Sequence, residues 1–305
     1  QILDGLITPR IMADALSVHP AAVLVSALVF ADLIGILLIA CSMNDNMESN
    51  GLLHQKGAVD IYSNSWGPSD NGNTKEAPGP LMLAAFEEQA YGGRNGLGGI
   101  ITFAGGNGGS NSDDSNYDGY ANSRFTLAIG AVDDGGDRSY YSEPGANLIV
   151  VAPSDGGASG ITTTDIEGSG GYSNGDWTNS FGGTSSATPL VSGIIGLIYD
   201  ADPNLTWRDV QHILVNSAHK VDAGNSGWTT NGAGHEINHE YGHGMIDAGA
   251  ATNLAANWTN VRAEDNWTSG QINVGTTIPD NSASWTTEYL NVSAGIKVET
   301  VEVLC

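Results

Sequence analysis

A serine on a glycine-rich turn has the clearest capacity for chemistry in this chain. The stretch Phe181-Gly-Gly-Thr-Ser185-Ser-Ala-Thr-Pro189 runs directly into the apolar residues 190–198, which predicts a tight turn that opens a helix. The unpaired N–H groups at the start of a helix favour developing negative charge, so Ser185 could act there as a nucleophile. The alternative is a helix cap without chemistry, in which Thr184 or Ser185 caps the helix and Pro189 lies in its first turn.

A second candidate, Asn107, lies on another glycine loop. The sequence Ala104-Gly-Gly-Asn107-Gly-Gly109 follows the apolar residues 99–104, which predicts a buried strand that ends at this loop. An amide N–H held at such a place can stabilise an oxyanion as it forms. The alternative is an asparagine that serves only the turn, by taking a positive φ.

A third pattern suggests a metal. His235-Glu236-Ile-Asn-His239 fits the His-Glu-x-x-His pattern of zinc peptidases, and His243 follows closely. That chemistry requires a helix, which places the two imidazoles on one face. The glycines that flank this stretch favour a loop or short strands, so a zinc peptidase remains the weaker of the alternatives.

Short apolar strands that alternate with helices must position these loops. Continuous apolar strands are typical of a parallel sheet covered on both faces, and the alternation indicates an α/β domain. We predict strands at 59–62, 99–104, 126–130 and 147–152, and helices at 79–91, 186–200 and 206–218. From about residue 260 the pattern changes to that of an all-β domain, which divides the chain into residues 1–260 and 261–305.

Residues 21–43 form an apolar run whose length would allow a helix to span a membrane. A buried helix and an insertion foreign to the fold are the other interpretations. A spanning helix would have to leave and re-enter one globular domain, so we favour an insertion over residues 18–56, with a loop at 44–55, and regard a membrane partner as unlikely.

The charge balance excludes one class of partner. The 305 residues include 34 Asp and Glu but only 10 Lys and Arg, which gives a formal net charge of −24. Nucleic-acid binding requires basic patches, so no nucleic acid is expected. An acidic chain suits a cation or a basic substrate. The two cysteines, Cys41 and Cys305, cannot build a disulfide framework.

Several short motifs follow one another along the chain: Ser65-Trp66-Gly67-Pro68, Ala104-Gly-Gly-Asn107-Gly-Gly109, Tyr117-Asp118-Gly-Tyr120, Tyr141-Ser-Glu143, Gly183-Thr-Ser185, Pro203-Asn-Leu-Thr-Trp-Arg-Asp209 and Asn231-Gly-Ala-Gly234. In this order they resemble the kexin/furin-type proprotein convertases, a branch of the subtilisin-like serine proteases (subtilases). The resemblance covers residues 1–17 and 57–305. It implies a subtilisin-like parallel sheet with helices on both faces, followed by the first strands of a β-sandwich (jelly-roll) P domain.

The resemblance also implies an activity and its residues. We expect a secreted or extracellular serine endopeptidase that cleaves after basic residues, with Ser185 as nucleophile and Asn107 as oxyanion donor. Asp70 and Asp118 match acids that face a P1 arginine or lysine, and Glu76 matches an acid for a basic P4 residue. Further substrate-binding positions are Ser65, Trp66, Gly67 and Tyr120.

The resemblance further implies a calcium ion held by Asp70, Asp113 and Glu143. Oxygen ligands drawn from separate loops suit this ion, and a cation would explain why acids cluster. The alternative for each of them is a solvated surface carboxylate, which is common in so acidic a chain.

The chain departs from the family pattern at several positions. Leu6, Pro9 and Met12 stand where acids are expected, which predicts a weaker demand for basic residues beyond P1. Ser115 and Tyr117 replace two cysteines.

The largest departure concerns the catalytic base. No histidine lies in the His-Gly-Thr setting of the family, and a serine without a base is a weak nucleophile. We considered Asp4, which precedes a glycine, as the triad acid, but a strand end before a helix fits it better. We therefore expect the triad Asp and His upstream of this sequence, and keep a non-catalytic peptide-binding relative as the alternative.

Overall fold

The computed structural model describes residues 43–264, and all structural statements refer to them. The chain divides between Asn260 and Val261, and every element below lies before that point. Several sequence predictions fall outside the described residues: those for Asp4, for Leu6, Pro9 and Met12, for most of the apolar run 21–43, and for the P-domain strands within 265–305. The P-domain prediction therefore stays a prediction.

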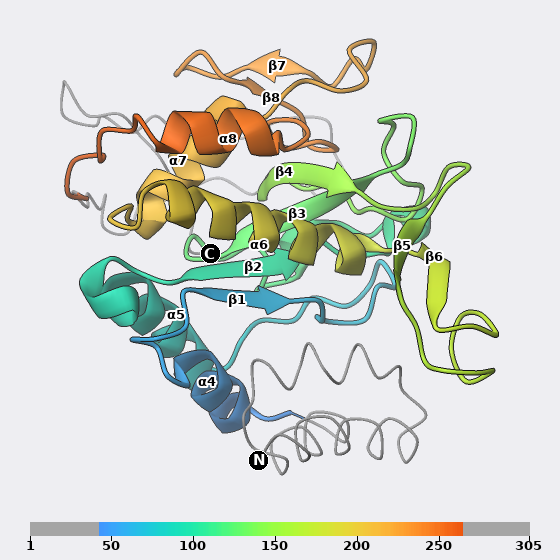
Figure 1. Ribbon diagram of the computed structural model, residues 1–305, viewed down its shortest axis with the longest axis horizontal. Coiled ribbons are helices and arrows are strands. Elements are labelled where there is room, and N and C mark those ends of the chain that lie inside the picture. Colours follow the sequence, from blue (N-terminus) through green and yellow to red (C-terminus); the bar gives the residue numbers. More distant parts are fainter. Residues whose placement is uncertain (1–42, 265–305) are drawn as a thin grey trace, which may run out of the picture. The chain divides into compact units, whose positions relative to one another are not determined.

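A four-stranded parallel sheet in the order β1-β2-β3-β4 forms the centre of the fold (Figure 1). Its strands are β1 Ile61–Asn64, β2 Ile100–Ala104, β3 Leu127–Val132 and β4 Leu148–Pro153. Every residue of β2 and β3 is buried, as expected of parallel strands covered on both faces. The four predicted strands are confirmed, with small shifts at their ends.

Alternating side chains build one apolar layer on each face of the sheet. Ile100 and Ile129 pack with Ile195 of a long helix on one face. On the other face Phe103 packs edge-to-face against Phe86, with 6.2 Å between ring centroids. Because residues one apart on a strand point to opposite faces, a continuous apolar strand fills both layers.

Helices cover both faces, as predicted. They are α4 Asp45–Leu53, α5 Pro80–Gly92, α6 Thr184–Ala201, α7 Trp207–Ser217 and α8 Ala248–Ala255. Helix α6 contacts all four strands on one face of the sheet and packs against α8, whereas α5 packs on the other face with α4 beside it (Figure 1). Thr206 and Asp209 cap α7 reciprocally, as the sequence indicates.

Residues 44–56 are part of this fold, so the prediction of a loop at 44–55 inside a foreign insertion is wrong for them. The Asn44 side chain caps α4 by accepting the N–H of Met47. Asp45 then accepts the N–H groups of Leu81 and Met82 at 2.9 and 2.7 Å. Since the N-cap of α5, Gly79, has no side chain, α4 supplies the cap that α5 lacks.

Two antiparallel hairpins lie outside the central sheet. Strands β5 Ile161–Thr164 and β6 Trp177–Phe181 form the hairpin that leads into α6. Strands β7 Thr229–Thr230 and β8 Glu236–Ile237 form the other. Single turns of 3-10 helix occur at η1 Gly93–Gly96, η2 Gly109–Asn111 and η3 Ser115–Tyr117. Within the described part of the chain, no helix has the length and apolar character needed to cross a bilayer.

Candidate active site

The turn that carries Ser185 is fixed by hydrogen bonds from neighbouring loops. Gly183 has a φ of +79°, a conformation that favours glycine. Its N–H donates to Asp155 Oδ1 at 3.0 Å and to the Tyr141 hydroxyl at 3.1 Å. Helix α6 starts at the next residue, so the half-buried Ser185 lies in its first turn.

The interpretation of Thr184 or Ser185 as a helix cap is wrong. The N-cap position belongs to Gly183, and no side chain caps it. Ser185 Oγ has no hydrogen-bond partner among residues 43–264. Its hydroxyl is therefore available for a role other than capping.

Pro189 connects the serine turn to the end of β1. It lies inside α6 and has no N–H, so the carbonyl of Ser185, four residues earlier, loses its helical donor. Ser65 Oγ donates to that carbonyl at 3.1 Å instead. The predicted substrate-binding segment that starts at Ser65 is thus held directly against Ser185.

Asn107 lies next to the serine turn with its amide in a defined orientation. Its Oδ1 accepts the backbone N–H of Thr184 at 2.8 Å and the hydroxyl of Thr184 at 3.0 Å. A backbone N–H can only donate, so the atom that faces it must be the oxygen. The Nδ2 group has no partner within the described residues, and this leaves a donor beside Ser185.

Asp118 forms the centre of an acidic region next to the Ser65–Gly67 segment. Its Oδ1 accepts the N–H groups of Tyr120 and Ala121 at 2.7 and 3.3 Å. A Cβ added to Gly67 would come within 2.9 Å of Asp118 Oδ2, so a larger residue at 67 would displace the Asp118 carboxylate. Burial is the main cause that raises the pKa of Asp118 to about 6. The charges of Asp70 and Glu76 act in the same direction, and the backbone hydrogen bonds of Tyr120 and Ala121 oppose them.

Aromatic rings support this region from the side of the sheet. The Trp66 ring packs edge-to-face against Tyr120, with 5.0 Å between centroids, and against Phe103, with 5.3 Å. Tyr120 is buried and Trp66 is half-buried. These two predicted substrate-binding residues therefore form an aromatic layer on one side of the acidic region.

Two further acids from separate segments belong to the same region. The backbone of Glu76 pairs with the loop of Asp118, since the N–H of Gly119 donates to Glu76 O at 2.8 Å. Glu48 of α4 accepts the hydroxyl of Tyr120 at 3.0 Å. Burial raises the pKa of Glu48, a rise that the Tyr120 hydrogen bond opposes and that the charges of Asp45 and Glu76 reinforce.

Glu48 is the residue that the sequence interpretation missed. We expected weak recognition of basic residues beyond P1, because residues 6, 9 and 12 are not acids, but that expectation ignored α4. Asn44 followed by acids at 45 and 48 is the usual signature of a helix start and could have identified this helix. The acidic region thus consists of Glu48, Asp70, Glu76 and Asp118.

Asp113 and Glu143 are buried beside this region, with 5% and 3% exposure, whereas Asp70 is exposed. Gly108 N–H donates to Glu143 Oε1 at 2.9 Å, and Gly72 N–H donates to Asp113 Oδ2 at 2.8 Å. Burial is the main cause that raises the pKa of Glu143 to about 8, and the charges of Asp113 and Asp70 contribute to this rise. Carboxylates buried so close together repel each other unless a proton or a cation lies between them.

The donor set of Asp70, Asp113 and Glu143 fits a hard cation, because all its atoms are carboxylate oxygens from separate loops. Among residues 43–264, however, no three His, Cys, Asp or Glu side chains form a complete metal-binding group. The three carboxylates are neighbours that interact in pairs rather than a closed cage.

The structure removes the basis for a zinc peptidase at His235 and His239. Strand β8 occupies the middle of the motif, and extended backbone separates residues four apart by about 13 Å, whereas a helix stacks them one turn apart. His235 instead meets His243 edge-to-face at 6.0 Å. Burial lowers the pKa of His243, whose Nδ1 contacts the carbonyl of Glu236.

A polar hollow borders the serine turn, and the sequence analysis did not predict it. It has a volume of about 620 Å³ and is lined by Tyr140, residues 155–160, Thr162, Asn179 and Ser180. Asp155, which holds Gly183, connects the hollow to the turn. None of its lining residues belongs to the predicted site.

The comparisons with known proteins identify the family of the chain. The chain matches the model of the subtilase family over residues 28–244. It is 39% identical over 235 residues to the PC3-like endoprotease variant B of Hydra vulgaris, which covers 75% of this chain and 32% of that protein. It is also 39% identical over 229 residues to furin of Homo sapiens (74% and 28%), and 35% over 265 residues to protease KEX1 of Kluyveromyces lactis (87% and 34%).

Solved structures give the same fold. The crystal structure of the serine protease of Aeromonas sobria matches with a TM-score of 0.64 and 25% identity, over 70% of this chain and 47% of that one. The α/β part of the predicted fold is confirmed. The chain spans about a third of the length of the relatives named above. From its motifs, its fold and these similarities, the chain belongs to the subtilase family, in its kexin/furin-type branch.

Proposed function

We propose that the protein containing this chain is a calcium-dependent serine endopeptidase that cleaves peptide bonds after basic residues. The observation that carries the proposal is the hydrogen bond between Ser65 and the Ser185 carbonyl, because it joins the serine to the edge of an acidic region. A substrate chain that reaches Ser185 would place its preceding side chain beside Asp118.

In this mechanism Ser185 Oγ attacks the carbonyl carbon of the scissile bond. The free Nδ2 group of Asn107 donates to the oxyanion that develops, and no reorganisation is needed because Thr184 already fixes its other side. The proton of Ser185 passes to a histidine base, which we assign, with its aspartate partner, to sequence upstream of this chain.

Basic side chains of the substrate would enter the acidic region. Asp118 and Asp70 would face the P1 arginine or lysine, since a planar guanidinium can bind two carboxylate oxygens at once. Glu76 and Glu48 extend the negative charge, so we infer that basic residues are also favoured upstream of P1. It differs from the sequence-based expectation of a weaker requirement for basic residues beyond P1.

Calcium would be held by Asp70, Asp113 and Glu143. When bound it would supply positive charge that relieves their mutual repulsion and orients Asp70 toward the substrate side chain. Because this chain is similar to proteins named furin and protease KEX1, we further propose a secretory-pathway or extracellular location, with peptides or proteins as the substrates and no nucleic acid.

The test compares peptide substrates that differ only at P1 on the full-length protein, with calcium present. We expect kcat/KM for an Arg-P1 peptide to exceed that for a Leu-P1 peptide by at least about a hundredfold, as loss of a buried charge pair predicts. Equal rates would remove Asp70 and Asp118 from the pocket. Binding of the Arg-P1 peptide without cleavage would favour the non-catalytic alternative.

A further inference from the structure

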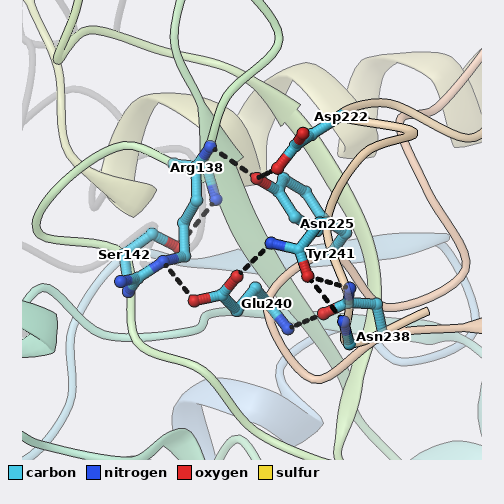
Figure 2. A network of polar contacts seen from close by, with 9 residues as sticks. Arg138, Ser142, Asp222, Asn225, Asn238, Glu240 and Tyr241 are labelled. Atoms are coloured by element: carbon cyan, nitrogen blue, oxygen red, sulfur yellow. Dashed lines mark hydrogen bonds and ion pairs between the residues drawn. The ribbon is translucent and has the colours of Figure 1, made fainter.

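We propose that Arg138 and Glu240 are positioning residues that hold Glu143 and the Asn107 loop in place for calcium binding and catalysis. Figure 2 shows this pair within a network of polar contacts. The inference rests on the proposed calcium site, but neither residue belongs to that site. It assigns a role to the segment 222–241, which lies far from the site residues in the sequence.

Arg138 contacts two partners through different nitrogens of its guanidinium. Nη1 donates to the carbonyl of Ser142 at 2.5 Å, and Nε pairs with Glu240 Oε1 at 3.2 Å. The Arg138 backbone N–H also donates to the Tyr241 hydroxyl at 3.1 Å, and that hydroxyl donates to Asp222 at 3.0 Å. One residue thus connects the loop that contains Ser142 to the segment 222–241.

Glu240 is held in position by its own neighbours. Its Oε2 accepts the Nδ2 group of Asn225 at 2.7 Å, and its backbone N–H donates to Asn238 Oδ1 at 2.7 Å. Asn238 in turn donates to Asn225 Oδ1 at 3.0 Å, which closes the network (Figure 2). The carboxylate therefore approaches Arg138 from a fixed direction and loses little side-chain freedom on pairing.

The loop held by Arg138 leads directly into the candidate site. Ser142 precedes Glu143, whose N–H donates to Gly106 O at 3.3 Å. Gly109 N–H donates to Tyr141 O at 2.8 Å. Because Gly106 and Gly109 flank Asn107, residues 139–143 lie between the network and the oxyanion loop and can transmit a displacement from one to the other.

A second link joins the same two segments beyond Glu143. The N–H of Gly145 donates to the carbonyl of His239 at 2.7 Å, one residue before Glu240. Glu143 therefore lies on a loop that the segment 222–241 holds at both ends. The side chains of Arg138 and Glu240 are 25% and 33% exposed, so their attraction is only partly screened by water.

The experiment measures calcium affinity in the full-length protein with Ser185→Ala, which prevents self-digestion. Calcium binding is followed by titration calorimetry for this background, for Glu240→Gln and for Arg138→Lys. Removal of a direct partner of a metal ligand typically costs 10- to 100-fold in metal affinity. Glu240 acts one contact further out, through Arg138 and the carbonyl of Ser142, so we expect the lower end of that range, about tenfold, for Glu240→Gln. Lysine cannot reach both partners of Arg138, so Arg138→Lys should lose a similar factor.

Glu236→Gln is the matched control. Glu236 lies in the same segment and pairs with Lys220 at 2.7 Å, but neither residue contacts the loop of Glu143. We expect its calcium affinity to equal that of the background. In the active protein, excess calcium should restore the kcat of Glu240→Gln. Bound calcium also stabilises any folded variant, so thermal unfolding without calcium must show that Glu240→Gln and Glu236→Gln are equally stable for this rescue to support the positioning role.

The outcomes separate the two proposals. If the background binds calcium and Glu240→Gln binds it equally well, the positioning role is wrong and the calcium site stands. If Glu236→Gln weakens calcium binding as much as Glu240→Gln, the loss of affinity comes from the lost negative charge alone, and the positioning role is again wrong. If the background binds no calcium, both proposals fail.

Discussion

The serine turn and the acidic region lie side by side but are stabilised in opposite ways. At the serine turn donors pair with acceptors, as when Asn107 accepts two hydrogen bonds from Thr184 and the carboxylate of Asp155 accepts the N–H of Gly183. In the acidic region, carboxylates with the same charge lie close together, with Asp70 and Glu76 exposed and Glu48 and Asp118 half-buried. Burial raises the pKa of Asp118 there, and it raises the pKa of the neighbouring Glu143 as well. The first region is complete without a ligand, whereas the second is organised for positive charge that comes from outside.

This difference assigns different tasks to the two regions. Fixed neutral dipoles stabilise charge that develops during a reaction, because they need no reorganisation at that moment. Buried like charges oppose folding but create a strong field for a cation. Changes at the serine turn should therefore affect kcat, and changes in the acidic region should affect substrate choice and pH dependence.

The sharpest test of the serine turn is Asn107→Asp in the full-length protein. Aspartate keeps the oxygen that accepts from Thr184 but removes the free N–H donor and adds a charge. We expect kcat to fall by about 10²- to 10³-fold, the usual cost of one oxyanion donor, while KM changes little. Steady-state kinetics on an Arg-P1 peptide provides both values. A drop confined to KM would place Asn107 among the binding residues instead.

The acidic region should make KM for basic substrates depend on pH. Below about pH 6 Asp118 takes up a proton, so KM for an Arg-P1 peptide should rise as the pH falls through this value, by up to about tenfold per pH unit. KM for a Leu-P1 peptide should stay constant, and Asp118→Asn should remove the pH effect. An unchanged profile in Asp118→Asn would mean that another group titrates.

The same titration has a consequence for stability. The folded protein holds the Asp118 proton up to about pH 6, above the ordinary value of 3.8, so between these values it binds more protons than the unfolded chain. Its free energy of unfolding therefore decreases as the pH rises through this window. In Asp118→Asn the free energy of unfolding should depend less on pH over this range. Denaturant titrations near pH 3.8 and near pH 6 would measure the difference.

The smallest expected effect belongs to the contact that joins the two regions. In Ser65→Ala the Ser185 carbonyl loses the donor that replaces the missing N–H of Pro189. We expect the free energy of unfolding to fall by about 1 kcal/mol, the usual cost of one such hydrogen bond. Chemical denaturation measures it, with the exposed Ser110→Ala as control. Equal stability of the two variants would show that water replaces the hydroxyl at no cost.

Features of local origin could be predicted from the sequence alone. The apolar runs of β1 to β4, the capping box of α7 and the glycine turn before Ser185 each depend on residues close together in the chain. Hydrophobic periodicity and turn chemistry act over such short distances. The same local reasoning failed at 44–55, where we predicted a loop. Helix α4 is short, and the prediction there followed the apolar run 21–43 beside it rather than the helix cap at Asn44.

Only the tertiary structure decided how the side chains meet. The orientation of the Asn107 amide depends on Thr184, 77 positions away; Glu48 meets Tyr120 across 72 positions; and Arg138 meets the segment of Tyr241 across 103. Such contacts form when packed elements bring distant loops together, and no local pattern encodes them. The sequence determined which residues are capable of chemistry, and folding determined which of them act on one another.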